Sequence, residues 1–167
     1  HKLNGGVSRF KKFEYFFSNI LNKNDYQIEL NEALTIYERK VWEGLTTCNL
    51  IPGIKDFLIF LKKNNKILYV NSGSEERELN HIFEERGLFN FFNKIMGSPS
   101  SKKENMTEIL KREDKDSKGI FFGDAKIDKE VAIEFGLHFI FVSEFSEWKN
   151  YPNDMCAIKN FVNLEKN

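Results

Sequence analysis

Short, uninterrupted apolar runs alternate with amphipathic segments from Pro52 onward. The clearest runs are 67–70, 120–122 and 139–142, and a shorter one is Ile95–Met96. Each run is too short for a helix and is followed by Asn, Gly or Ser, which predicts buried strands. The intervening segments have helical spacing of their apolar residues. This alternation favours a parallel sheet with helices on both faces, and therefore an α/β fold.

The first fifty residues show no strand pattern and predict helices instead. Apolar residues recur with helical spacing over 10–21, with Ser8 as the candidate N-cap, and again over 30–45. Two such helices cannot bury their apolar faces alone, so we expect them to pack on each other and on a neighbour. We therefore divide the chain into a helical subdomain, residues 1–50, and an α/β core, residues 51–167.

Charge and cysteine content exclude several classes of protein. The 167 residues contain 25 basic and 25 acidic side chains, so the net charge is zero and neither a nucleic-acid partner nor a membrane partner is expected. No apolar run approaches the roughly 18 residues of a spanning helix. Cys48 and Cys156 are predicted to be reduced thiols, which favours a cytoplasmic location. The chain begins with His1 and shows no signal-peptide pattern, so we expect the natural N-terminus to lie further upstream.

Polar residues follow the predicted strands, where open α/β sheets bind their ligands. Ser72, Gly73 and Ser74 end the first strand and are expected to start a helix. Hydroxyls, a flexible backbone and free helix N–H groups suit a phosphate, and an ordinary helix cap is the alternative. Lys102 lies in the first turn of a later helix, where a cation opposes the helix dipole. A residue placed against such a local preference, close to a presumed site, indicates a function. The alternative is that Lys102 is an ordinary lysine in contact with solvent.

The segment Gly123–Asp128 carries the strongest chemical signal. Asp124 and Asp128 lie four residues apart at a strand end and a helix start, so both carboxylates can face one cation. Mg²⁺ takes one or two protein carboxylates and keeps its other positions for water or phosphate. A turn with an N-cap at Asp128 is the alternative. No His or Cys cluster has the spacing of a zinc site, and we expect His81 and His138 to be structural or exposed.

Taken together, these segments resemble the haloacid dehalogenase (HAD) superfamily, whose members are mostly phosphatases. In that family one strand ends in Ser or Thr, a Lys follows at a helix start, and G-D-x-x-x-D follows another strand. This chain has Ser72, Lys102 and Gly123–Asp128 in the same order. The resemblance covers residues 52–142, and the helical first third looks like the family's small cap. It implies a Rossmann-like, HAD-like parallel sheet.

The resemblance also implies roles for individual residues. Ser72 would hydrogen-bond the transferring phosphoryl group, and Lys102 would neutralise charge on the phosphate and the nucleophile, with Lys103 as the fallback. Asp124 would hold Mg²⁺, with Asp128 as second ligand or outer-shell support. The implied catalytic set is Ser72, Lys102 and Asp124. The implied substrate-binding residues are Ser72, Gly73, Ser74 and Lys102.

One family motif is missing from the 167 residues. The family's nucleophile is the first Asp of D-x-D-x-[TV], on a strand that lies between those ending at Ser72 and Asp124, and this motif does not occur here. We therefore expect two strand edges without partners, at a cost of about 1–3 kcal/mol for each buried unpaired backbone group. The slot is expected to be empty, rearranged, or filled by another chain through chain exchange or oligomerisation.

The leading hypothesis is a Mg²⁺-dependent HAD-type phosphatase that acts on a small phosphorylated metabolite through an aspartyl-phosphate intermediate. Without the nucleophile Asp, the chain as given is expected to be inactive. One alternative is a non-catalytic pseudo-phosphatase or partner-binding module. Another is a HAD phosphomutase or dehalogenase, because these enzymes share the motif residues.

Overall fold

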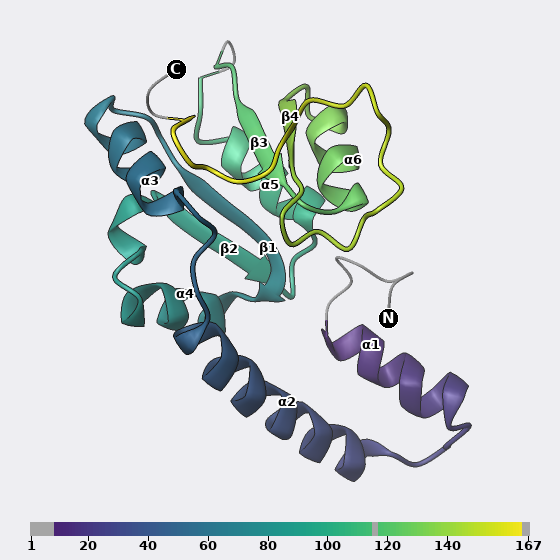
Figure 1. The fold of residues 1–167 in the computed structure, drawn as a ribbon. Coiled ribbons are helices and arrows are strands. Elements are labelled where there is room, and N and C mark those ends of the chain that lie inside the picture. Colours follow the sequence, from purple (N-terminus) through teal and green to yellow (C-terminus); the bar gives the residue numbers. More distant parts are fainter. Residues whose placement is uncertain (1–8, 115–116, 165–167) are drawn as a thin grey trace.

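A computed structural model describes residues 9–114 and 117–164, so the candidate N-cap Ser8 lies outside the described residues. The order of helices and parallel strands confirms the predicted α/β class (Figure 1). The elements are α1 (Arg9–Tyr15), the π-helical turn η2 (Phe16–Ile20), α2 (Gln27–Thr47), α3 (Ile54–Lys63), β1 (Tyr69–Glu75), α4 (Glu76–Glu85), the 3-10 turn η3 (Phe89–Phe91), β2 (Lys94–Ser98), α5 (Lys102–Leu110), β3 (Ile120–Gly123), α6 (Lys126–Glu134), β4 (His138–Val142) and β5 (Ala157–Ile158).

The strands form two parallel sheets rather than one. β1 pairs with β2, and β3, β4 and β5 form the second sheet in that order. Within residues 9–114 and 117–164, no strand ladder joins β1 to β3, and Figure 1 shows β1 and β2 apart from β3 and β4. This arrangement agrees with the prediction that two strand edges in the middle of the sheet lack partners.

The start of α4 differs from the prediction. The first strand was expected over 67–70 with Ser72–Ser74 opening a helix, whereas β1 runs to Glu75 and includes all three residues. The N-cap is Glu75, whose carboxylate accepts hydrogen bonds from the backbone N–H groups of Arg77 (3.1 Å) and Glu78 (2.7 Å). An acceptor at this position satisfies amides that have no partner inside the helix. The expectation of a serine-capped helix is therefore wrong.

Two apolar clusters cover the sheets from opposite faces. The first is centred on α5, α6 and β2, and partly buried side chains of β1 and β3 pack against it. The second joins α3 to the sheet of β3, β4 and β5, where the rings of Phe57 and Phe122 meet edge to face at 5.7 Å. Because the cluster on α5 touches strands of both sheets, α5 lies where the two sheets approach each other.

The helical arm, which we define as α1, η2 and α2, contacts the core through α4. Arg9 of α1 forms an ion pair with Glu78, and Trp42 of α2 meets His81 edge to face at 4.8 Å. Arg86, which follows α4, donates hydrogen bonds to two carbonyl oxygens at the end of α2 (2.7 and 2.6 Å). The helix α4 and the residue that follows it therefore hold the arm at its beginning and near its end.

The ion pair between α1 and α4 is buried and bidentate. The side chains of Arg9 and Glu78 are 11% and 4% exposed, and both guanidinium nitrogens reach the carboxylate. Burial alone would lower the pKa of Arg9, but the hydrogen bond and charge of Glu78 hold that pKa above its usual value. The Arg9 guanidinium thus keeps its charge in this buried position.

Replacing Arg9 with lysine is expected to lower the free energy of unfolding by about 1–2 kcal/mol, because an ammonium cannot reproduce the two-pronged contact with a buried carboxylate. Urea denaturation measures the change. The matched control is Arg112→Lys, since Arg112 pairs with Glu108 at 2.9 Å in an exposed position, and its effect should stay within about 0.5 kcal/mol. Equal effects of the two substitutions would contradict a buried pair at α1.

The structure bears on two further features, the cysteines and membrane-spanning helices. Cys48 and Cys156 are both exposed and unpaired, as expected. No helix in the described part of the chain is long and apolar enough to cross a membrane.

Candidate active site

Ser72 and Ser74 lie near the end of β1 and are half-buried. The Ser72 hydroxyl oxygen accepts a hydrogen bond from the Ser74 backbone N–H at 3.1 Å, which leaves the hydroxyl hydrogen available for a ligand. The first free N–H groups of α4 are less available, because Glu75 already binds those of Arg77 and Glu78. The predicted cradle of free helix amides is therefore wrong here, and any phosphate contact at this strand end must come from the hydroxyls and the strand backbone.

Lys102 is the first residue of α5. The helix begins with a capping box, in which the Ser101 hydroxyl accepts from the Glu104 N–H (3.2 Å) and the Glu104 carboxylate accepts from the Ser101 N–H (2.7 Å). Ammonium groups are disfavoured at this end of a helix, and the nearby Asp128 carboxylate offsets that cost through an ion pair. The Lys102 side chain is 14% exposed and that of Asp128 is 3% exposed.

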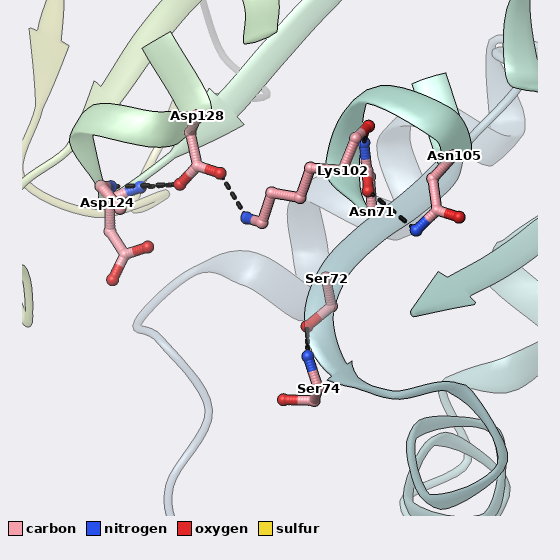
Figure 2. Close-up of polar contacts among 8 residues, drawn as sticks. Asn71, Ser72, Ser74, Lys102, Asn105, Asp124 and Asp128 are labelled. Atoms are coloured by element: carbon pink, nitrogen blue, oxygen red, sulfur yellow. Dashed lines mark hydrogen bonds and ion pairs between the residues drawn. The ribbon is translucent and has the colours of Figure 1, made fainter. Parts of the chain in front are cut away.

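The structure separates the two candidate lysines. Lys103 forms an exposed ion pair with Glu134 of α6 at 2.5 Å, with side chains that are 53% and 47% exposed. Only Lys102 extends toward the acidic segment at the end of β3 (Figure 2). The geometry therefore favours Lys102 over the fallback Lys103.

Both carboxylate oxygens of Asp128 are already used. One binds the Lys102 ammonium, and the other accepts from the backbone N–H groups of Asp124 (3.2 Å) and Ala125 (3.1 Å). Gly123 makes room for this arrangement, because a Cβ at that position would lie 2.4 Å from the Cβ of Asp128. Asp128 was predicted as a second metal ligand or as outer-shell support. Its partners correspond to the second role, since it positions the Asp124 backbone and Lys102.

Asp124 is exposed, and its carboxylate points away from the Asp128 carboxylate (Figure 2). Partial desolvation of the carboxyl group raises the pKa of Asp124 above its usual value, the charge of Asp128 raises it further, and the Lys102 ammonium opposes both. Among the described residues, no lysine or arginine forms an ion pair with Asp124. Its backbone is fixed by Ser146, whose buried hydroxyl donates to the Asp124 carbonyl oxygen at 2.5 Å.

The donor set fits a magnesium ion that uses few protein ligands. No three His, Cys, Asp or Glu side chains gather into a metal-ligand cluster anywhere in 9–114 or 117–164. Asp124 nevertheless offers hard carboxylate oxygens, and two carboxylates stand beside the single positive charge of Lys102. A divalent cation would relieve this local excess of negative charge, and Mg²⁺ accepts one or two carboxylates with water or phosphate in its remaining positions.

Contacts link Lys102, Asp128 and Asp124, and they reach the strand that carries Ser72 through Asn71. Lys102 contacts Asp128, whose other oxygen binds the Asp124 backbone, and Asn71 links the Lys102 backbone to that strand (Figure 2). Asn71, Asn105 and Ser146 were not predicted as residues of the site. Asparagine and serine are common in turns, so their types alone gave no signal of buried positions next to the site.

An open groove of about 440 Å³ lies between α2 and α4. Arg39 and Trp42 of α2 and Arg77 and His81 of α4 are among the residues that line it. Glu75, three residues after Ser72, also lines it, whereas Ser72, Lys102 and Asp124 are not among its lining residues.

A parallel α/β core with a helical arm, and with Ser, Lys and Asp at its carboxyl ends, is the arrangement of HAD-like proteins. The family model for haloacid dehalogenase-like hydrolases matches residues 7–142, and the chain belongs to this family. The resemblance inferred from the motifs and the predicted fold class are thereby confirmed. No curated relative matches the chain significantly.

Solved structures of HAD-type proteins are similar over most of the chain. A haloacid dehalogenase-like family hydrolase from Streptococcus pneumoniae is 26% identical, with a TM-score of 0.64 over 80% of this chain and 67% of that one. YfnB from Bacillus subtilis, in a magnesium-bound crystal structure, is 23% identical with a TM-score of 0.68 over 97% and 71%. A HAD phosphatase from Thermococcus onnurineus is 16% identical with a TM-score of 0.63 over 92% and 77%. The last two similarities show the fold alone.

Proposed function

We propose that this hydrolase is a Mg²⁺-dependent phosphatase that acts on a small phosphorylated metabolite. The observation that carries the proposal is the position of the Lys102 ammonium, which Asp128 anchors next to Asp124 at the rim that also bears Ser72. A cation, a carboxylate with hard oxygen atoms and a hydroxyl donor are the groups that stabilise a phosphoryl group during transfer.

Each residue has a distinct part in the proposal. The Ser72 hydroxyl donates to a phosphoryl oxygen, and the Lys102 ammonium neutralises negative charge on the phosphate. Asp124 holds Mg²⁺, which supplies further charge neutralisation when bound, and Asp128 keeps Lys102 and the Asp124 backbone in place. The magnesium-bound form of YfnB is consistent with the choice of metal.

The nucleophile is proposed to come from a D-x-D-x-[TV] segment, which the 167 residues do not contain. Such a segment would form an aspartyl-phosphate that water then hydrolyses. The unpaired edges of β1 and β3 offer backbone donors and acceptors for an additional parallel strand, supplied from upstream or by another chain through exchange or oligomerisation. The chain as given is therefore proposed to be inactive.

The groove between α2 and α4 supports a small substrate. Its volume of about 440 Å³ matches a metabolite rather than a macromolecule, and Glu75, the last residue of the strand that carries Ser72, is among its lining residues. The helical arm, within the proposed cap of residues 1–50, would contact the organic part of the ester. A cytoplasmic location is part of the proposal and is supported by the two exposed, unpaired cysteines.

A phosphatase assay with Mg²⁺ tests the proposal. The chain as given and a version extended upstream of His1 are compared on a panel of small phosphate monoesters. We expect turnover only from the extended version, and we expect EDTA to abolish it. Robust turnover by the shorter chain would contradict the assignment of the nucleophile to a missing segment.

A second candidate function is a non-catalytic module that binds phosphate ligands or a protein partner through the same strand ends. This candidate needs no D-x-D-x-[TV] segment, and the 167 residues contain none. An extended version that lacks the paired aspartates, or that binds inorganic phosphate without turning over any ester, would support this candidate. Turnover products from the same assay would separate a phosphatase from a phosphomutase or dehalogenase.

A further inference from the structure

A chain of hydrogen bonds ties the start of α5 to both strands of the first sheet. Asn71 lies on β1, immediately before Ser72, and its side-chain amide donates to the carbonyl oxygen of Lys102 at 2.8 Å. The Asn105 amide donates to the Asn71 side-chain oxygen and to the Gly97 carbonyl of β2, both at 3.3 Å. Figure 2 shows the two asparagines side by side at the base of the Lys102 side chain.

This network is not explained by stability alone. Asn105 is 1% exposed, and its side-chain oxygen has no hydrogen-bond partner among the described residues; the same is true of the buried Ser98 hydroxyl. A buried polar atom without a partner costs stability, whereas an apolar side chain of similar volume carries no such cost. Met96 and Met106, next to this site in the sequence, belong to the apolar cluster on α5, so leucine would suit the surroundings.

We propose that Asn71 and Asn105 are positioning residues that fix Lys102 relative to Ser72. The inference rests on the proposed function, in which Lys102 and Ser72 contact the same phosphoryl group. The Asn71 amide holds the Lys102 backbone on the strand that carries Ser72, and Asn105 holds Asn71 in turn. With its backbone fixed there, the Lys102 side chain reaches Asp128 across the space between the two sheets.

The test measures how readily the Lys102 side-chain amino group is acetylated, which needs no ligand and no turnover. Trace acetylation followed by mass spectrometry compares Lys102 with its exposed neighbour Lys103, which serves as an internal reference. We expect Lys102 to react more slowly in the unsubstituted chain. In Asn71→Leu and in Asn105→Leu, the ratio of the Lys102 rate to the Lys103 rate should rise by about tenfold or more, because the ammonium leaves its buried pair more often.

Asn80→Leu is the matched control. Asn80 also donates from its side chain to the carbonyl of the first residue of a helix, Glu76, at 2.8 Å, but it lies on α4. This variant should leave the acetylation ratio unchanged. Thermal unfolding is recorded for every variant, and a midpoint within about 4 °C of the unsubstituted chain shows that the fold is retained.

An unchanged ratio in both folded asparagine variants would overturn the positioning role. If Asn71→Leu does not fold, Asn71→Ser removes the same amide donor with a smaller change and decides the question. Binding of inorganic phosphate in the presence of Mg²⁺, measured by calorimetry on the chain extended upstream, separates the two proposals. A Lys102/Lys103 acetylation ratio that does not rise in the asparagine variants counts against the positioning role. Absence of phosphate binding in the unsubstituted extended chain counts against the proposed function.

Discussion

Replacing Asp128 with leucine is expected to lower the free energy of unfolding by about 3–5 kcal/mol, because one partner of a buried ion pair is removed. The Lys102 ammonium would then be left largely buried without its counter-charge, and the N–H groups of Asp124 and Ala125 would lose their acceptor. Urea denaturation followed by circular dichroism measures the loss.

Two further variants show whether the loss comes from the buried pair. Lys103→Met removes the exposed pair with Glu134 and should cost less than about 1 kcal/mol. The double variant Lys102→Met/Asp128→Leu should recover part of the stability, because no unpaired charge remains in the interior. A single Asp128→Leu variant as stable as Lys103→Met would show that Asp128 does not hold Lys102 in a buried pair.

Replacing Asp124 with asparagine is expected to weaken Mg²⁺ binding by at least about 100-fold, because the charge of the coordinating carboxylate is lost. In the version extended upstream, phosphatase turnover should fall by about 100-fold or more with it. Calorimetric titration with Mg²⁺ gives the affinity, and the ester assay gives the rate.

Asp154→Asn is the matched control for this substitution. Asp154 is exposed in the loop before β5, so the same change of side chain there should alter neither Mg²⁺ affinity nor turnover. Asp128→Asn should lower Mg²⁺ affinity by about 10–100-fold, as expected for a residue that orients a ligand without touching the metal. Unchanged affinity in Asp124→Asn would remove Asp124 from the proposed metal site.

The fold could be predicted from hydrophobic periodicity because most of its elements are regular. The strands over 120–123 and 138–142 and the helix stops at Gly87 and Gly136 follow directly from apolar runs and from glycines with positive φ. β5 could not be predicted, because the two residues Ala157–Ile158 carry no periodic signal. Its pairing with β4 is a tertiary contact.

The site was only partly predictable for a related reason. Residue types and order identified Ser72, Lys102 and Asp124, but competition for hydrogen bonds decides what each group is free to do. The carboxylate of Glu75 accepts hydrogen bonds from the helix amides that a phosphate was expected to bind. The carboxylate oxygens of Asp128 bind the Lys102 ammonium and backbone N–H groups. Neither outcome can be read from spacing, because a carboxylate at a helix start can cap, pair or bind a metal.

The anchoring of the helical arm on α4 has a mechanical consequence. Arg9 forms an ion pair with Glu78, and Arg86 donates hydrogen bonds to the last carbonyls of α2. The helical arm and α4 are therefore expected to move as one rigid unit. A movement of this unit would twist the backbone at Glu75, the residue that follows Ser74 and ends β1. Widening the groove between α2 and α4 without disturbing the serines of β1 therefore requires the buried Arg9–Glu78 ion pair to break first.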